Sequence, residues 1–331
     1  MLFALTLLIL FFALSLLANL CIGEVFVAPG EAIAILSGKL TGASAEVLLN
    51  IRLPRLLTAA LVGAALSASG YLLQKLSRND LADPYLTGVS SGAALAVAAG
   101  ILTGLDFTIL PILALVGGTL SSLLVIALAK NSSGKLGLSV PKLLLAGIAL
   151  SSLATAIVNL LMSIFGNQTM AQGLGLWLAG GVSGRTWAEL LPAFIYVFLA
   201  IIFALVMAKP LRLLSLGEEA AASLGLNVQV SQLAILGCAV LLAATAVSLS
   251  GLVGFVGLIG PQLARRLLRG TERLETIAAA LSGAILTLLA DLAARTLSGG
   301  QELPLGTLMA LVGAPVFIIL LSRNVDRLEV Q

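Results

Sequence analysis

The sequence predicts an all-α membrane protein with about ten transmembrane helices, organised as a single transmembrane domain over residues 1–331. Hydrophobic residues fill 60% of the 331 positions and charged residues only 10%, and one soluble core cannot bury so large an apolar fraction. The mean hydropathy is +1.14. Apolar runs of the length that a membrane requires, roughly 17 to 25 residues, recur along the chain. The connections between them are short, so we expect no soluble domain.

Ten apolar runs are candidates for membrane spans. The boundaries are least clear within residues 230–268, where glycines interrupt the apolar pattern. An even number of spans places both termini on the same side of the membrane. The expected spans are residues 3–21, 55–74, 86–104, 108–129, 143–165, 190–208, 230–250, 252–268, 276–293 and 305–322.

The basic residues predict the orientation of these spans. If both termini are cytoplasmic, thirteen of the eighteen Lys and Arg residues lie inside, as the positive-inside rule requires. The five that lie outside become candidates for function, because topology does not demand them. The inside set is Lys75, Arg78, Lys130, Lys135, Lys142, Lys209, Arg212, Arg265, Arg266, Arg269, Arg273, Arg323 and Arg327, and the outside set is Lys39, Arg52, Arg55, Arg185 and Arg295.

Several kinds of chemistry are excluded by residue types. The chain has no histidine, which removes histidine-based metal ligation and acid–base catalysis. Cys21 and Cys238 are the only cysteines, and their apolar surroundings favour packing over a disulfide or a metal site. The sequence at 133–136 lacks the upstream glycine and the final Ser/Thr of a nucleotide-binding loop. We therefore expect no cofactor and no metal on this chain, no enzymatic activity and, despite a net charge of +3, no nucleic-acid partner.

Residues 212–227, RLLSLGEEAAASLGLN, are too polar and too short to cross a membrane. They contain good helix formers and end near a glycine, which predicts a short helix outside the membrane. A solvated connector is the alternative. It is the weaker interpretation, because it would leave four leucines of this segment exposed without a partner.

Glycine recurs at every third position in GLVGFVGLIGP, at 251, 254, 257 and 260, just before Pro261. Small residues at such spacing permit close contact between helices, and proline removes a backbone donor. A packing seam is therefore favoured over direct contact with a substrate.

Several separated segments together resemble the permease subunits of bacterial importers for iron-siderophores, haem and cobalamin, the FecCD/BtuC-type ATP-binding-cassette permeases. The resemblance covers roughly residues 50 to 325 and implies a BtuC-like, type II importer fold. The matching segments are RLPR at 52–55, Gln74 with RNDLADPYLTGVSSGA at 78–93, LLLAGIALSS at 143–152, LGEEAAASLG at 216–225, GFVGLIGPQLARRL at 254–267, and ADLAAR with ELPLG at 290–306.

Two positions depart from the family pattern. Asp80 stands where the family commonly has proline, and Gln262 stands where it commonly has histidine. Asp80 can begin a helix by capping free backbone N–H groups, so the fold is not threatened. Gln262 puts in doubt only the role of the usual histidine.

The resemblance implies that an extracytoplasmic substrate-binding protein docks on Arg52, Arg55 and Arg295, three of the five outside basic residues. Without the resemblance, other interpretations are favoured. Arg52 and Arg55 would anchor the second span at the interface, and Arg295 would pair with Asp291 one helical turn away.

On the cytoplasmic side, the resemblance identifies residues 212–227 as the loop that couples the permease to its ATPase. The matching residues are Arg212, Leu216, Gly217, Glu218, Glu219, Ala222, Leu224 and Gly225. Asn79 and Leu81 match the positions that close the pathway toward the cytoplasm in the family. Helix capping and loop packing are equally good interpretations of these two residues.

The implied protein is a permease in the bacterial inner membrane that moves a ferric siderophore, haem or cobalamin inward. Its partners would be a second permease subunit, as in a homodimer, two cytoplasmic ATPase subunits that bind ATP and Mg²⁺, the substrate-binding protein and membrane lipid. The alternative is a secondary transporter driven by an ion gradient, which usually places ionisable residues near the midplane. Asp291 is the only acidic residue deep in an expected span, so this alternative has little support.

Overall fold

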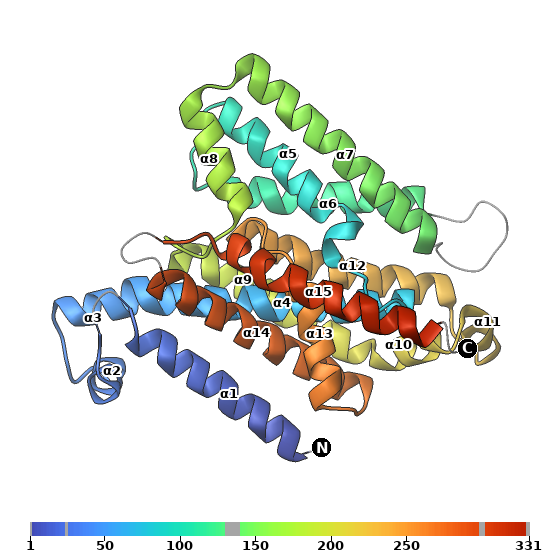
Figure 1. The fold of residues 1–331 in the computed structure, drawn as a ribbon, viewed down its shortest axis with the longest axis horizontal. Coiled ribbons are helices and arrows are strands. Elements are labelled where there is room, and N and C mark those ends of the chain that lie inside the picture. Colours follow the sequence, from blue (N-terminus) through green and yellow to red (C-terminus); the bar gives the residue numbers. More distant parts are fainter. Residues whose placement is uncertain (1, 24–25, 130–139, 298–301, 329–331) are drawn as a thin grey trace.

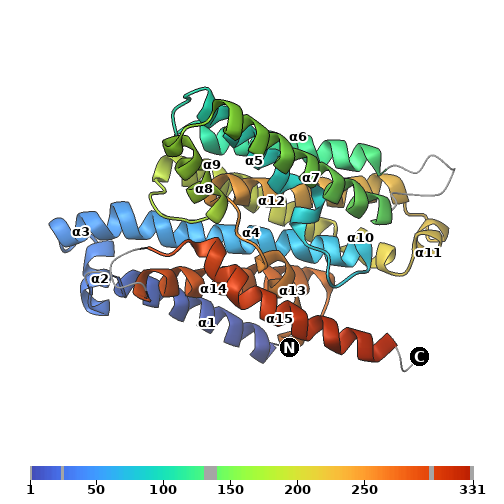
Figure 2. The same cartoon turned by 45° about the horizontal axis from the view of Figure 1, so that its top comes forward.

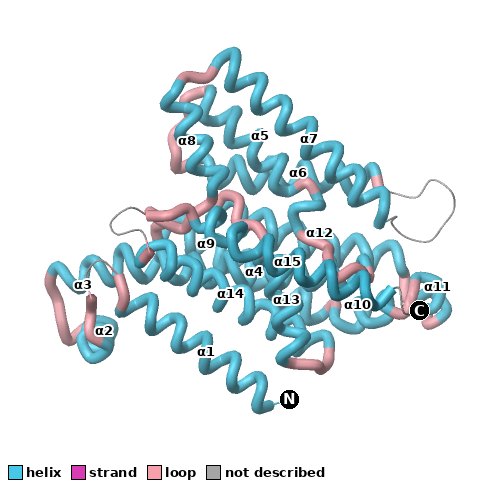
Figure 3. The backbone as a smooth tube through the Cα atoms, viewed as in Figure 1, coloured by secondary structure: helices cyan, strands magenta, loops and turns pink. Residues whose placement is uncertain are grey.

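The structure is a computed structural model that describes residues 2–23, 26–129, 140–297 and 302–328. These residues form helices and connecting loops, with no strand among them (Figures 1 and 3). The helices are α1 (Leu2–Cys21), α2 (Pro29–Leu36), α3 (Ala43–Val47), the π-helical turn η1 (Leu48–Arg52), α4 (Leu53–Ser77), the 3-10 turn η2 (Pro84–Thr87), α5 (Val89–Leu102), α6 (Leu110–Leu128), α7 (Val140–Phe165), α8 (Gln168–Ala179), α9 (Trp187–Val206), α10 (Ala208–Ser215), α11 (Glu218–Ser223), α12 (Val228–Ser250), α13 (Val256–Leu267), α14 (Glu272–Thr296) and α15 (Leu305–Leu328).

Polar side chains begin several of these helices by accepting hydrogen bonds from the free N–H groups of the first turn. Asn227 Oδ1 accepts from the backbone N–H of Val230 at the start of α12 (3.1 Å). Thr186 and Glu189 form a reciprocal capping box at the start of α9. The apolar helices therefore begin at residues that the local sequence marks.

Helix α4 lies at the centre of the bundle and packs against α14, α12 and α13. In the most apolar window of the continuous segment Ala43–Ser77, which ends with α4, 89% of the residues are buried, against 22% for Lys142–Phe165 in α7. In Figures 1 and 2, α1 and α14 lie on one side of α4, and α5, α6, α7 and α8 form a group on the other side. The exposed apolar faces of outer helices such as α7 and α9 suit contact with lipid.

Glycines bring the α4 backbone into direct contact with its neighbours. A Cβ atom on Gly63 would lie 2.3 Å from the carbonyl oxygen of Gly283 on α14, and one on Gly70 would lie 1.8 Å from the oxygen of Gly257 on α13. The packing seam predicted from the glycine repeat is therefore present at Gly257. Gly254, in contrast, has no neighbour where a side chain would be.

The all-α prediction is confirmed, while the boundaries of the spans differ from expectation. Among the described residues, seven helices are long and apolar enough to cross a membrane, and two further apolar helices, Val89–Leu102 and Leu305–Ile319, are shorter. The span expected at 252–268 is the twelve-residue helix α13, which begins only at Val256. Gly251 ends α12 with a φ of +63°, and the chain is not helical again until Val256. Helix α8 was not expected.

The two ends of the bundle carry different elements. Helices α2 and α3 lie at one end, and α10 and α11 lie at the other (Figures 1 and 2). The N-terminal end of α1 and the C-terminal end of α15 both point toward the end that carries α10 and α11. Of the basic residues expected near that end, Lys130 and Lys135 lie outside the described residues.

We expect Gly70→Ala to destabilise the protein, because its new Cβ would overlap the oxygen of Gly257. Overpacking of this kind costs about 1–3 kcal/mol. Thermal unfolding in detergent, followed by size-exclusion chromatography, measures the effect. Gly237→Ala on α12 is the control, because nothing lies within 4 Å of its new Cβ. Equal thermal stability of the two variants would contradict the packing argument.

Candidate functional site

Three charged side chains from α4 and α14 meet at the end of the bundle that carries α2 and α3. Arg55 Nη2 lies 2.9 Å from Asp291 Oδ1, and Arg295 Nε lies 3.3 Å from Asp291 Oδ2. The Asp291 side chain is only 1% exposed. A buried carboxylate needs such partners, because an uncompensated buried charge is very costly. Arg55, Asp291 and Arg295 are called the outer cluster below.

The first helix completes this arrangement. Arg295 Nη2 donates to Asn19 Oδ1 of α1 (2.6 Å), and Asn19 Nδ2 donates to the backbone oxygen of Leu288 on α14 (3.0 Å). Arg52 Nη1 donates to the backbone oxygen of Leu20 (3.1 Å), and the Arg52 side chain is buried. The three arginines predicted to dock a partner therefore lie together, and each also makes contacts within the chain. The Arg295–Asp291 pair expected from the alternative interpretation is present. The docking role itself remains a prediction.

Glu302 is a member of this site that the sequence analysis missed. Its carboxylate accepts hydrogen bonds from Arg55 Nη1 and from the Ser183 hydroxyl, and its side chain is 48% exposed. Partial burial raises the pKa of the Glu302 carboxyl, but the hydrogen bonds from Arg55 and Ser183 outweigh this effect and hold the pKa below its ordinary value. The ELPLG segment was recognised as a family motif, but no local spacing links it to Arg55.

Arg185, another outside basic residue, belongs to a separate pair. Its Nη1 donates to Glu189 Oε1 one turn later in the chain (2.9 Å). Glu189 also takes part in the capping box of α9. Arg185 therefore stabilises the start of a helix and is not part of the outer cluster.

The predicted coupling segment lies at the opposite end of the bundle. It forms two short helices, α10 and α11, where one was expected, because Gly217 breaks the helix with a φ of +121°. Gly225 follows α11 with a φ of +82°, as expected for a glycine that ends a helix. Leu216 and Leu224 are 64% and 62% exposed.

The other residues of the coupling segment divide into anchored and exposed groups. Ala222 packs against the hydrophobic core, and Glu218 Oε1 accepts a hydrogen bond from Gln232 Nε2 on α12 (2.9 Å). Arg212 and Glu219 are exposed. The segment is thus held to the bundle on one side and presents leucine and charged side chains on the other.

Arg78, which directly precedes the residues predicted to close the pathway, lies close to this coupling segment. Arg78 ends α4 in the left-handed conformation (φ 51°), and a Cβ on Gly217 would lie 3.8 Å from its guanidinium. Asn79 Oδ1 accepts from the backbone N–H of Leu81 (3.0 Å). This Asx turn is the loop-packing role that the residue types also suggested.

Asp80 does not begin a helix, contrary to expectation. The capping residue in this loop is Asp83, whose Oδ1 accepts from the backbone N–H of Tyr85 at the start of η2 (2.8 Å). Proline follows directly at position 84 and fixes the backbone at the first position of η2. Asp80 is therefore not the capping residue of this loop.

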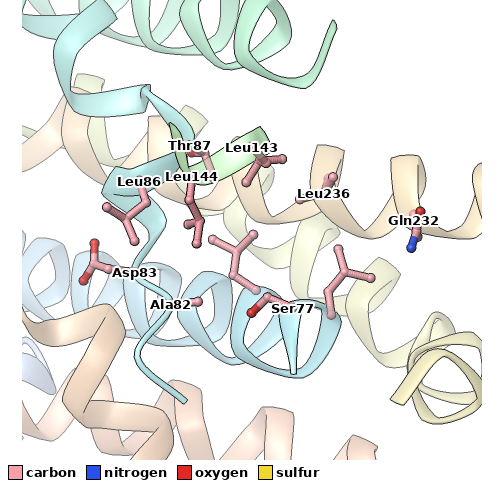
Figure 4. A pocket seen from close by; sticks show the side chains of 11 residues that line it. Ser77, Ala82, Asp83, Leu86, Thr87, Leu143, Leu144, Gln232 and Leu236 are labelled. Atoms are coloured by element: carbon pink, nitrogen blue, oxygen red, sulfur yellow. The ribbon is translucent and has the colours of Figure 1, made fainter. Parts of the chain in front are cut away.

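An apolar cavity lies beside this loop (Figure 4). Leucine side chains of α4, α7 and α12 form most of its wall, and Asp83 and Gln232 are among its few polar side chains. Asp83 is engaged by Tyr85, and Gln232 donates to Glu218. The cavity therefore offers mainly hydrophobic contact.

We expect Asp291→Asn to destabilise the protein strongly, because it leaves two partly buried arginines without their shared carboxylate. Breaking a buried pair in this way costs about 3–5 kcal/mol. Thermal unfolding in detergent measures the loss, with Glu46→Gln on the exposed face of α3 as the control. A loss no larger than that of the control would show that the outer cluster does not stabilise the fold.

Comparison with known proteins agrees with this architecture. The FecCD transport family profile matches residues 7–323. The hemin transport system permease protein HmuU of Yersinia pestis is 40% identical over 84% of this chain and 84% of its own length. The vitamin B12 import system permease protein BtuC of Vibrio parahaemolyticus is 35% identical, over 93% of this chain and 90% of its own.

A solved structure is also similar, described as an inward-facing conformation of a putative metal-chelate type ABC transporter. It superposes with a TM-score of 0.83 at 32% identity, over 96% of this chain and 97% of that chain. The family match and these relatives show that the chain belongs to the FecCD transport family of permeases, a transport family and not one of enzymes.

Proposed function

We propose that this chain is the permease subunit of a binding-protein-dependent ABC importer that moves a metal chelate into a bacterial cell. Two copies of the chain enclose the pathway, two ATPase subunits bind ATP and Mg²⁺ on the cytoplasmic side, and a substrate-binding protein delivers the cargo from outside. The chain itself binds no cofactor. The relatives in the family support this assembly, because several are named as transport-system permeases.

The observation that carries the proposal is the exposure of Leu216 and Leu224, the residues that directly follow α10 and α11. Leu216 and Leu224 stand out from a segment whose other side is anchored to the bundle. The segment is too short and too polar to be a membrane span. These leucines therefore do not anchor a span in lipid. Exposed leucines flanking charged Glu219 suit a protein partner at this end.

The outer cluster supports the docking half of the proposal. Arginines at a bundle end attract carboxylates, and Arg55 already binds the half-exposed carboxylate of Glu302. The binding protein would present glutamates to Arg52, Arg55 and Arg295. On docking, a glutamate of the binding protein would replace Glu302 as the carboxylate bound to Arg55.

The proposed topology has both termini in the cytoplasm of a cell with an inner membrane. The seven long helices, counted together with α5, α13 and α15, would give about ten crossings. Helix α13 has only twelve residues, so its crossing would include the non-helical residues before Val256. The end that carries α10 and α11 would face the cytoplasm.

The proposed cargo rests on the names of the relatives and not on metal-binding residues of this chain. Among the described residues no cluster of three or more Cys, Asp or Glu side chains could hold a metal ion. The relatives are named for hemin, ferric enterobactin and vitamin B12. We propose a ferric siderophore first, with haem and cobalamin as the other candidates.

The ion-gradient alternative depends on Asp291. Two arginines hold this carboxylate, and its side chain is 1% exposed. A coupling ion would have to displace both guanidinium groups from a buried carboxylate, and breaking a buried ion pair is strongly destabilising. The pairing therefore favours the importer.

We expect Glu219→Arg to fold and insert normally but to reduce the substrate-stimulated ATP turnover of the reconstituted importer, since a reversed charge would face the ATPase. Replacing a complementary charge at an interface by a like charge weakens binding by roughly tenfold or more. Co-purification of the ATPase and turnover in nanodiscs measure the effect. Glu46→Arg on α3 is the matched control, an exposed glutamate at the opposite end.

Wild-type turnover for Glu219→Arg would overturn the coupling role of this segment. Reduced turnover in both variants would point to a general defect. A wild-type chain that purifies without an ATPase, yet takes up cargo with an ion gradient, would overturn the importer itself.

We expect Glu302→Gln to strengthen docking of the substrate-binding protein by about threefold to tenfold, because it frees Arg55 from a competing carboxylate. Surface plasmon resonance on the permease in nanodiscs measures the affinity. Glu189→Gln, which removes the partner of Arg185, is the control. A weaker affinity for Glu302→Gln would mean that Glu302 orients Arg55 for docking and does not compete with the partner.

A further inference from the structure

The two positions that depart from the family pattern contact each other. Gln262 Nε2 on α13 donates to the backbone oxygen of Asp80 (3.0 Å). One turn further along α13, Arg265 Nη2 lies 3.2 Å from Asp80 Oδ1. Asp80 is therefore held by α13 through both its backbone and its side chain.

A buried amide lies behind this contact. Arg265 Nη2 also donates to Gln74 Oε1 of α4 (2.7 Å). Gln74 Nε2 in turn faces the backbone oxygens of Ala82, Gly257 and Leu258 at 3.3 to 3.4 Å. Arg265 thus joins the loop to the end of α4, and Gln74 joins the end of α4 to the start of α13.

We propose that Asp80, Gln262 and Arg265 are positioning residues that hold residues 78–83 against α13 and so set the place of Asn79 and Leu81. The proposal rests on the proposed function for one step, the role of this loop at the cytoplasmic end of the pathway. A loop that must move to admit cargo has to leave α13, and the Asp80–Arg265 pair resists that movement.

The exposure of the pair fits a contact that forms and breaks. The Asp80 side chain is 65% exposed and that of Arg265 21%, so water can replace Arg265 as the partner of the Asp80 carboxylate at little cost. The neighbouring pair of Lys75 and Glu275 differs, because the two side chains are 24% and 11% exposed and Tyr71 also contacts Glu275. That pair joins α4 to α14 as part of the fold.

Amide hydrogen exchange of the full chain in lipid nanodiscs tests the proposal without any partner. Asp80→Asn keeps the shape of the side chain and removes its charge, so exchange of the amides of residues 79–82 should rise by up to about fivefold. Asp80→Glu should restore the wild-type rate. High salt should raise exchange in the wild type but not in Asp80→Asn, because it screens the pair that the variant lacks.

Asp106→Asn, an exposed aspartate in the loop before α6, should leave this segment unchanged. Gln262→Ala should raise exchange further when combined with Asp80→Asn, since it removes the backbone contact. Wild-type exchange in Asp80→Asn, or no restoration by Asp80→Glu, would overturn the proposal.

A second readout separates this proposal from the function on which it rests. In the reconstituted importer, Asp80→Asn should raise the ATP hydrolysed per molecule of cargo moved, and Asp80→Glu should restore the ratio. An unchanged ratio together with faster exchange would overturn the positioning of the pathway residues. Failure of the wild type to transport would count against the importer and leave the exchange result standing.

Discussion

The close backbone contact of α4 with α13 and α14 is the constraint on which the rest of the structure depends. At Gly70 and Gly63 there is no room for even a methyl group. This contact fixes the depth and direction of α4, whose first turn carries Arg55 and whose last turn leads to Arg78 and Asn79. Both candidate sites are therefore placed by one helix.

The outer cluster follows from the same packing. Because α14 is pressed against α4, Asp291 reaches Arg55 across the contact and Arg295 along its own helix. A carboxylate in such a place must be paired, and the arginines that pair with it are thereby oriented at the bundle end. The same guanidinium groups thus serve both stability and recognition. Glu302 contacts the side of the Arg55 guanidinium that Asp291 does not contact.

The sequence predicted those features that depend on composition or on local spacing. The all-α membrane class follows from apolar runs, and the pairing of Arg295 with Asp291 follows from an i,i+4 spacing. The break between α12 and α13 was only partly foreseen, because the glycines that interrupt the helix were assigned to a span. Helix α8 was missed because its twelve residues are short and include polar side chains.

Contacts between distant segments could not be predicted in this way. Nothing local indicates that Glu302 would bind Arg55, or that the two unusual residues Asp80 and Gln262 would meet. Taken singly, neither departure from the family pattern indicates a partner in the fold. Their contact becomes evident only when α13 is packed against the end of α4.

The contrast between the two parts of this region explains how a rigid bundle can carry a movable segment. Helix α4 is held by apolar packing and glycine contacts that tolerate no displacement, and it ends abruptly at Arg78 in the left-handed conformation. The next residues leave the helix. They are held by turn hydrogen bonds from the backbone N–H groups of Asn79 and Ala82, by an Asx turn, by Gln262 and by one exposed ion pair. Such polar contacts break at far lower cost than a packed glycine seam. Movement at this end is therefore expected in residues 79–83 and not in the helix that positions them.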